Sequence, residues 1–417
     1  MNRRSVIKGL LAGVAAGGFR MPLVHAADYT GKFFAFVQAV GGWDPTSFCD
    51  PKANTPGEPT INHWAEEDEV REAGNIPYAP FAANEAFFDK YHDRMLVING
   101  VDAQTNSHTI GTVHNWSGRS SEGYPTATAL LAAHHGPDLP VAYLTFGGFS
   151  YPAGIIRTTR LDNTDLLQAL AAPSTAPAGR YFGEADWAAL EAYANETANR
   201  LGEAAELVPA ESRRLAEYRS AFGAEGLKGF ADAINNSRQE SGLRRQAQLA
   251  VLGFRTGAAV SADLALGGFD THANHDTFHA NRLAQLANGV DYLWDFAETE
   301  GVADRLVVVM GSDFGRTNYY NAGDGKDHWP IGSFVVMEKH QPWADRAVGE
   351  TDDMHFARRI NPATLRHDDA NGTVIHPRHV HKALRRYLGI ETSVGAERYP
   401  FDGTEDFAFF AEPSADS

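Results

Sequence analysis

The 417-residue sequence is almost free of cysteine, and it has fewer basic residues than acidic ones. Its single cysteine, Cys49, excludes an internal disulfide framework. Lysine and arginine together number 36, against 53 aspartates and glutamates, so the formal net charge is −17. An excess of negative charge repels nucleic-acid phosphates and anionic lipids. We therefore expect neither nucleic acid nor an anionic membrane surface as a general partner.

Several familiar sequence patterns are also missing. The sequence has no internal repeat, no P-loop and no dinucleotide-binding fingerprint. Its Gly-Gly pairs at 41, 147 and 267 are too loosely placed to predict phosphate-binding loops. Hydrophobic residues make up 43% of the chain, which is ample for a large core. We predict a single α/β domain over residues 27–412.

The first 26 residues have the layout of an export signal. Arg3 and Arg4 precede a weakly apolar run of glycine and alanine, and residues 24–26 offer a small-residue cleavage site. This order is similar to a twin-arginine signal. The alternative is a short membrane anchor, but the apolar run is too short to span a bilayer comfortably. We predict export by the twin-arginine translocase to the periplasm or beyond, with no integral membrane segment after processing.

Apolar runs predict a sheet with helices between its strands. The run at 306–310 is rich in β-branched residues and suits a buried parallel strand. Helical periodicity is clear at 276–298, where the apolar residues share one face. Stretches rich in Ala, Leu, Glu and Arg predict a helical insertion at about 160–262, with a small-residue linker at 172–179. Further strands are predicted at 32–40, 95–101, 140–147, 264–266 and 332–337, and further helices at 81–91, 186–207, 211–222, 242–262 and 376–390.

Acids and histidines follow the ends of several predicted strands or close a glycine-rich loop. In open α/β sheets, the carboxyl ends of parallel strands are where ligands bind. Aspartates and histidines brought together from separate loops suit a divalent ion such as Zn²⁺ or Mn²⁺. Two such ions roughly 4 Å apart would hold the attacking and leaving oxygens of a phosphoryl or sulfuryl transfer. The candidate ligands are Asp44, Asp270, His272, Asp313 and His328.

Some of these residues also have a plainer interpretation. Asp44 follows two glycines and could be a turn acid or a helix N-cap. His328 could be a hydrogen-bonded histidine in a packed loop, and His275 and His279 stand at a helix start, where histidines more often cap the helix or face water. For Asp270 and His272 we favour the metal interpretation, because such a pair at a sheet edge has little structural purpose.

A group of hydroxyls follows the strand predicted at 95–101. Ser107 and His108 stand where this loop opens a helix, and a helix N-terminus stabilises an anion or a nucleophile that attacks one. Ser107 is therefore either a nucleophile or an ordinary N-cap. His108 and Arg316 complete the candidate catalytic set, because the planar guanidinium of Arg316 could hold the non-bridging oxygens of a substrate.

Five short motifs occur along the chain in the order GGWD, NSH, GFDTH, SDFGRT and GKDHWP. Together they resemble an exported family of uncharacterised function, DUF1501, which is distantly similar to the alkaline phosphatase and sulfatase superfamily. The resemblance covers nearly the whole chain after the export signal. It implies a three-layer α/β/α sandwich of alkaline-phosphatase-like type, with metal ions over the strand ends.

The resemblance also implies roles for individual residues. Asp44 matches the first-strand acid that binds one metal, whereas Asp270 and His272 match ligands of the other. Asp313 matches the acid of the superfamily's SDHG turn, and His328 matches its late histidine ligand. Ser107 stands near the place of the hydroxyl nucleophile. The chain departs from the superfamily where Phe314 replaces a second ligand.

Two classes of function remain open from the sequence. The first is an exported hydrolase of phosphate or sulfate esters that uses a divalent metal, either Zn, Mn, Mg or Ca, on a small-molecule or glycan anionic ester. The second is a non-catalytic metal- or ligand-binding extracytoplasmic protein that retains the fold, since fold does not fix function.

Overall fold

An eight-stranded sheet forms the centre of the computed structural model, which describes residues 29–171, 183–203, 207–222 and 224–412. The export segment at 1–26 and the linker at 172–179 lie outside the described residues. Among the described residues, no helix is both long enough and apolar enough to cross a bilayer. In sheet order, the strands are β12 (Arg346–Val348), β4 (Met95–Asp102), β11 (Ile331–Met337), β8 (Leu306–Ser312), β1 (Phe33–Val40), β7 (Ser261–Gly267), β5 (Tyr143–Thr145) and β6 (Thr158–Arg160).

The sheet is parallel except at one strand. β1 pairs in parallel with β7 on one side and with β8 on the other, as expected for the run at 306–310. β11 runs antiparallel to both β4 and β8, between which it lies. The carboxyl ends of β1, β4, β7 and β8 therefore meet at one edge of the sheet. This edge carries the candidate ligands.

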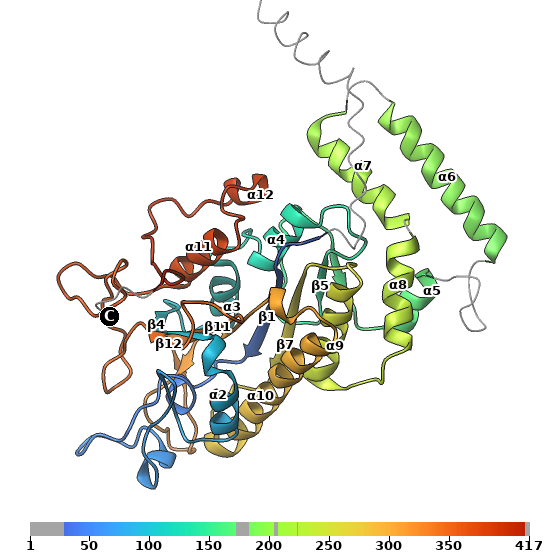
Figure 1. Cartoon of the computed structure of the whole chain (residues 1–417). Helices are drawn as coiled ribbons and strands as arrows, with labels where there is room; N and C mark the ends of the chain where they lie inside the picture. Colours follow the sequence, from blue (N-terminus) through green and yellow to red (C-terminus); the bar gives the residue numbers. More distant parts are fainter. Residues whose placement is uncertain (1–28, 172–182, 204–206, 223, 413–417) are drawn as a thin grey trace, which may run out of the picture.

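Helices cover both faces of the sheet, which gives three layers (Figure 1). Alternate residues of β1 point to opposite faces, so that Phe33 and Val37 pack with one helical layer and Phe34 and Phe36 with the other. The predicted α/β/α sandwich is therefore present. The first layer contains α2 (Asn84–Tyr91), α9 (Gly242–Arg255) and α10 (His275–Thr299), and the second contains α3 (His108–Ser117), α4 (Ala127–His135) and α11 (Pro377–Tyr387).

The predicted helical insertion is a run of four helices beyond the sheet edge formed by β6. In Figure 1, α6 and α7 stand away from the sheet, whereas α8 packs beside α5 and reaches α9. The helix predicted at 242–262 was too long, because α9 ends at Arg255 and residues 261–267 form β7. Pairing with strands on both sides decides the structure of this Ala- and Val-rich segment. The four helices are α5 (Thr164–Ala171), α6 (Glu184–Gly202), α7 (Pro209–Phe222) and α8 (Ala224–Asn235).

The remaining elements are short. β2 (Arg71–Ala73) and β3 (Ile76–Tyr78) form a hairpin in the excursion after β1. β9 (Gly315–Arg316) pairs with β10 (His328–Trp329), and this pairing brings the late histidine back beside the end of β8. Near the C-terminus, α12 (Val394–Glu397) follows α11.

Candidate metal centre

Three histidine side chains converge on one carboxylate oxygen of Asp270. The distance from Asp270 Oδ1 to Nε2 is 3.0 Å for His272, 3.2 Å for His328 and 3.3 Å for His108. The Nε2 atoms of His272 and His328 are 3.0 Å apart. Four potential metal donors from three separate segments of the chain therefore share one small volume.

The parallel strands bring these segments together. Asp270 and His272 lie in the loop after β7, His108 is the first residue of α3 after β4, and His328 lies on β10. Glycines allow the loops to approach closely. Gly41 has φ +118°, and a Cβ there would lie 2.6 Å from the backbone nitrogen of Asp270. The loops could not keep this arrangement if a larger residue replaced Gly41.

The second nitrogen of each imidazole is held by an acceptor. His108 Nδ1 lies 2.5 Å from Asp313 Oδ2, and His272 Nδ1 lies 2.7 Å from Asp327 Oδ1. His328 Nδ1 lies 2.8 Å from the carbonyl oxygen of Asn106. Because these acceptors cannot donate, we infer that each Nδ1 carries the proton. Each Nε2 then turns its lone pair toward Asp270, as second-shell partners arrange histidines around metals.

Asp313 is a partner of the centre rather than one of its converging donors. Its Oδ1 accepts hydrogen bonds from the backbone N–H groups of Gly41 and Gly42, at 2.9 and 2.8 Å. Burial alone would raise the pKa of Asp313, but the hydrogen bonds from His108 and the two glycines lower it. The hydrogen bond to Asp313 in turn raises the pKa of His108. Asp313 therefore orients His108.

Arg316 lies beneath the centre and not on its open side, which corrects the expected contact with substrate. The residue is fully buried, and its Nε and Nη1 donate to the carbonyl oxygens of Gly42 and Lys326, at 2.8 and 3.0 Å. Its Nη2 donates to the carbonyl of Gly41 and, at 2.7 Å, to Asp270 Oδ1. Burial would raise the pKa of Asp270, but Arg316 outweighs it and the pKa falls to about 2. Arg316 holds Asp270 ionised and in place.

The donor set fits a divalent cation. Donors about 2.1 Å from a shared ion in a tetrahedron would be roughly 3.4 Å apart, which is close to the distances from Asp270 Oδ1 to the three imidazole nitrogens. The donor atoms of His108, Asp270 and His328 all lie within 4.8 Å of one another, and His272 contacts this group through Asp270 and His328 without belonging to it. His108 Nε2 is also buried and has no hydrogen-bond partner within the described residues. A buried imidazole nitrogen whose lone pair is free, and which lies beside other donor atoms, is what a metal ligand requires.

Asp44 lies in a second cluster, which is completely buried and already contains a cation. Its Oδ2 is 2.6 Å from Lys326 Nζ and 3.2 Å from His275 Nε2. Lys326 Nζ also donates to Asn62 Oδ1 at 3.0 Å. Burial would raise the pKa of Asp44, yet the charge of Lys326 and the hydrogen bond with His275 hold it well below its usual range. The N-cap interpretation also holds, since Asp44 Oδ1 accepts from Thr46 N at 3.0 Å.

The two histidines at the start of α10 belong to this buried cluster, whereas the sequence suggested caps or solvent-facing residues. His275 and His279 are both fully buried, and their rings stack with centroids 4.6 Å apart. Burial lowers the pKa of each, and that of His279 falls well below its usual value. Their spacing of four residues, continued by Leu283, places them on the apolar face of the helix. That spacing was a usable sequence signal for burial.

Lys326 is the functional residue that the sequence reasoning missed. It stands inside the GKDHWP motif, directly before the Asp327-His328 pair, and its side chain is fully buried. The sequence did contain a signal for this role, because Lys326 stands beside residues that were expected to bind a cation. Its ammonium group neutralises Asp44, which was predicted to bind the metal.

Ser107 occupies the N-cap position of α3, beside His108. Among the described residues, no backbone N–H of α3 is capped by its hydroxyl, although its carbonyl oxygen accepts from Gly111 N at 2.8 Å. The Ser107 residue is exposed. Ser107 therefore directly precedes a residue of the centre, and its hydroxyl does not cap the helix.

A family model described as "Protein of unknown function (DUF1501)" matches residues 132–388. No curated protein matches the chain. Similar solved structures include a 2-O GAG sulfatase, at 9% identity over 88% of this chain and 72% of that one, with a TM-score of 0.36. The phosphonate monoester hydrolase of Agrobacterium radiobacter is 12% identical over 86% and 74%, with a TM-score of 0.35. A TAB5 alkaline phosphatase variant with Mg bound is 9% identical over 74% and 92%, at 0.31. Similarities this low carry over neither activity nor ligand.

Proposed function

We propose that this chain, which belongs to the DUF1501 family of unknown function, is a metal-dependent hydrolase of phosphate or sulfate esters. One observation carries the proposal: three imidazole Nε2 atoms lie within 3.3 Å of a single Asp270 carboxylate oxygen. Each imidazole has its other nitrogen fixed by a separate acceptor. His108, Asp270, His272 and His328 are the proposed ligands, with the last three drawn from the set that the sequence predicted.

The donor types narrow the choice of ion. Imidazole nitrogens suit Zn²⁺ and other transition metals, whereas Ca²⁺ and Mg²⁺ prefer shells made of oxygen. Three nitrogens and one oxygen therefore favour Zn²⁺ over Mn²⁺, Mg²⁺ or Ca²⁺. When bound, such an ion supplies a Lewis acid that polarises an ester oxygen and lowers the pKa of a coordinated hydroxyl group or water.

We propose one ion and not two. The second acid, Asp44, is neutralised by Lys326 Nζ at 2.6 Å, inside a fully buried cluster. A divalent ion there would face the ammonium at close range, in a region from which water is excluded, and the repulsion would be strong. Asp44, predicted as a metal ligand, is therefore proposed as a structural residue, and Asp313, also predicted as a ligand, is proposed as the residue that orients His108.

The chain's own groups would divide the chemistry between them. The proposed nucleophile is the exposed Ser107 hydroxyl, which lies at the N-terminus of α3 where the helix dipole favours developing negative charge. His108 is adjacent but is proposed as a ligand, because its Nε2 faces Asp270 and not the hydroxyl of Ser107. Arg316 acts from below by keeping Asp270 ionised.

The experiment compares two variants of the purified mature protein. His328→Ala should lose metal content and hydrolysis together, because a ligand is removed. Ser107→Ala should keep the metal and the melting temperature but lose turnover of aryl phosphate and aryl sulfate esters, because a nucleophile acts only in the chemical step. Ser120→Ala, at an exposed serine beyond the far end of α3, serves as the control. Metal is measured by elemental mass spectrometry.

A binding protein without catalysis is the second candidate, and the position of Arg316 favours it. All three nitrogens of that guanidinium are engaged by the protein, so Arg316 is not available to hold a substrate anion. A wild-type protein that holds metal but turns over neither ester would establish the second candidate and overturn the first.

We also propose that the protein is exported by the twin-arginine route, on the evidence of Arg3 and Arg4 before a weakly apolar run. Changing both arginines to lysine should leave the precursor in the cytoplasm. Cell fractionation with immunoblotting measures this, and unchanged export of the double variant would contradict the proposal.

A further inference from the structure

A cavity of 560 Å³ lies between α11, α12 and the segment that follows α12, and the metal centre does not use it. Phe401, which lines the cavity, packs against Gly118 at the C-terminal end of α3, whereas His108 begins the same helix. Ten residues of helix span about 15 Å, which separates the cavity from the centre. A volume of this size is typical of a pocket for a small molecule.

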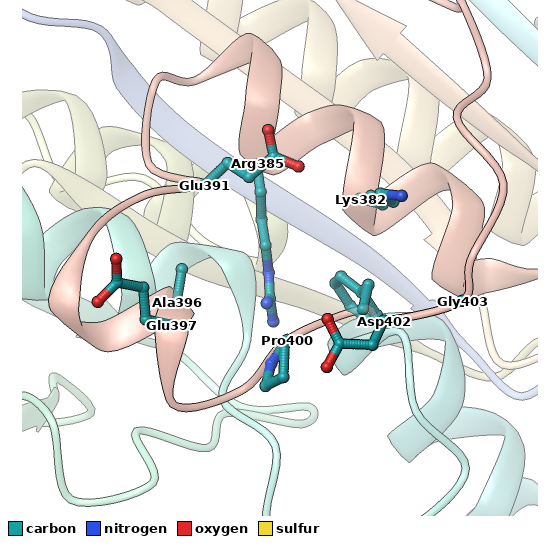
Figure 2. Close-up of a pocket in the computed structure, with 9 residues that line it drawn as sticks. Lys382, Arg385, Glu391, Ala396, Glu397, Pro400, Asp402 and Gly403 are labelled. Carbon is teal, nitrogen blue, oxygen red and sulfur yellow. The ribbon is translucent and has the colours of Figure 1, made fainter.

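Arg385 of α11 supplies the buried charge of this cavity. Its side chain runs from α11 toward Pro400, as Figure 2 shows, and only 3% of the residue is exposed. Nη1 donates to the carbonyl oxygen of Tyr399 at 2.5 Å, and the guanidinium stacks on the Phe401 ring at 4.1 Å. These contacts fix the plane of the guanidinium.

The other two nitrogens of Arg385 lack protein partners. Nε and Nη2 are buried, and neither has a hydrogen-bond partner among the residues that the structure describes. Within the same residues, no carboxylate forms an ion pair with Arg385. Buried arginines are almost always paired, because an isolated charge away from water is strongly destabilising. Burial and the nearby charge of Arg119 lower the pKa of Arg385 to about 9.

Nε and one Nη of a guanidinium form a fork that matches two oxygens of a carboxylate. The free atoms of Arg385 are such a pair. The neighbouring cation Lys382 is already engaged, since its Nζ lies 2.5 Å from the carbonyl oxygen of Thr404 and 2.8 Å from Asp406. The cavity therefore offers one specific site for an acid group.

The rim of the cavity carries the opposite charge. Glu391, Glu397 and Asp402 all line it and are all exposed, and Glu391 is also paired with Arg386, whose Nε lies 3.4 Å from Glu391 Oε2. In Figure 2, Glu397 lies to one side of the Arg385 side chain and Asp402 to the other. A ligand that is only an anion would be repelled by three carboxylates on its way to Arg385. A ligand that also carries an amine would be attracted by them.

We propose that this cavity binds a small zwitterion, whose carboxylate sits on Nε and Nη2 of Arg385 and whose ammonium group faces Glu391, Glu397 and Asp402. The ligand class is an amino acid or a short amino carboxylic acid. The proposal does not depend on the metal centre or on its activity.

Titration calorimetry with the full-length mature protein tests the proposal. The probes are β-alanine and γ-aminobutyrate as zwitterions, acetate as the carboxylate alone, and ethylamine as the amine alone. We expect at least one zwitterion to bind about tenfold more tightly than acetate, and ethylamine to bind more weakly still. Binding of acetate as tight as that of both zwitterions would overturn the proposal, and so would no binding of any probe.

Two variants locate the site. Arg385→Gln should abolish binding of the zwitterion, with circular dichroism to check that the protein is folded. The triple variant Glu391→Gln, Glu397→Gln, Asp402→Asn changes only exposed groups, so folding should be unaffected. It should lower the affinity for the zwitterion by about tenfold and raise the affinity for acetate. An unchanged preference for the zwitterion in the triple variant would refute the role of the rim, and with it the proposal.

Discussion

Two groups of aspartate and histidine lie near the same sheet edge, and they differ in how their negative charge is compensated. In the inner cluster, the side chains of Asp44, His275 and Lys326 are all fully buried, and the lysine ammonium neutralises the acid. In the outer centre, Asp270 is 46% exposed and three imidazole nitrogens turn toward it. The inner cluster is complete as a structural unit, whereas the outer one is arranged to receive a cation. Both acids have a protein cation as a partner, since Arg316 Nη2 lies 2.7 Å from Asp270 Oδ1. The two groups differ because Asp44 is fully buried against its cation, whereas Asp270 is half-exposed and faces three imidazole nitrogens.

The largest expected effect is the loss of metal affinity when the acid of the outer centre is removed, and the acid of the inner cluster provides the comparison. Asp270→Asn should lower metal affinity by more than about 100-fold, because losing even a second-shell partner costs 10–100-fold. Asp44→Asn should leave the metal content unchanged while reducing stability. Equilibrium dialysis with Zn²⁺ measures both variants. If Asp44→Asn lost metal as Asp270→Asn does, the distinction between the two groups would fail.

Removing the lysine tests the inner cluster directly. Lys326→Met should lower the free energy of unfolding by about 3–5 kcal/mol, because it leaves the buried Asp44 carboxylate unpaired. Adding Asp44→Asn to this variant should restore part of the lost stability, because the unpaired charge is then removed. Lys90→Met is the control: its ion pairs with Asp291 and Asp295 are exposed, so about 1 kcal/mol or less is expected. Urea unfolding measures all of them, and a loss in Lys326→Met no larger than in the control would contradict the role assigned to Lys326.

The partner of His272 should have a smaller effect on the outer centre. Asp327→Asn weakens the acceptor for His272 Nδ1, so metal affinity should fall by about 10–100-fold, which corresponds to roughly 1.4–2.7 kcal/mol. Asp324→Asn, at a nearby exposed acid that contacts His63, is the matched control. Competition with a metal indicator dye measures the affinity. Equal affinities of the two variants would show that Asp327 does not support the centre.

The smallest effect concerns the pH dependence of the inner cluster. Burial lowers the pKa of His279 well below its usual 6.5, so the folded chain keeps this residue neutral while the unfolded chain binds a proton below pH 6.5. Stability contributed in this way is present at neutral pH and is lost as the pH falls below 6.5. Between neutral pH and pH 5, protonation of His279 on unfolding should cost the wild type up to about 2 kcal/mol of its free energy of unfolding. His279→Gln should not show this part of the loss.

The experiment compares urea unfolding at pH 7.5 and pH 5, without metal, for wild type and His279→Gln. His134→Gln, at an exposed histidine on α4, is the control and should follow the wild type. A pH dependence of His279→Gln identical to that of the wild type would mean that His279 is not held neutral.

Much of the fold could be predicted because its signals are local. The strands at 33–40, 95–102, 306–312 and 331–337 lie within a residue or two of the apolar runs that predicted them. The helix predicted at 276–298 is α10, whose apolar residues are spaced for burial. The end of α9 was missed, because Ala and Val at 258–262 suit either structure and only pairing with β1 and β5 selects the strand.

The candidate site was predictable in part for the same reason. Asp270, His272 and His328 were identified from their positions after strands and glycine-rich loops, and the structure brings them together. The orientation of His108 depends on Asp313, which is 205 residues away along the chain. Likewise, the sequence places Arg316 correctly at a strand end but cannot reveal that Gly41, Gly42 and Lys326 engage its donors.

By itself, the sequence determined the strands, the main helices, the family and the set of acids and histidines at the sheet edge, because periodicity and short motifs act over a few residues. Only the tertiary structure decided which acid is fully buried against a lysine and which is half-exposed among imidazoles. Lys326 and Asp44 are 282 residues apart and meet because β1 and the loop before β10 converge at one edge of the sheet. Charge compensation depends on distances in space across the whole chain, and no local pattern encodes them.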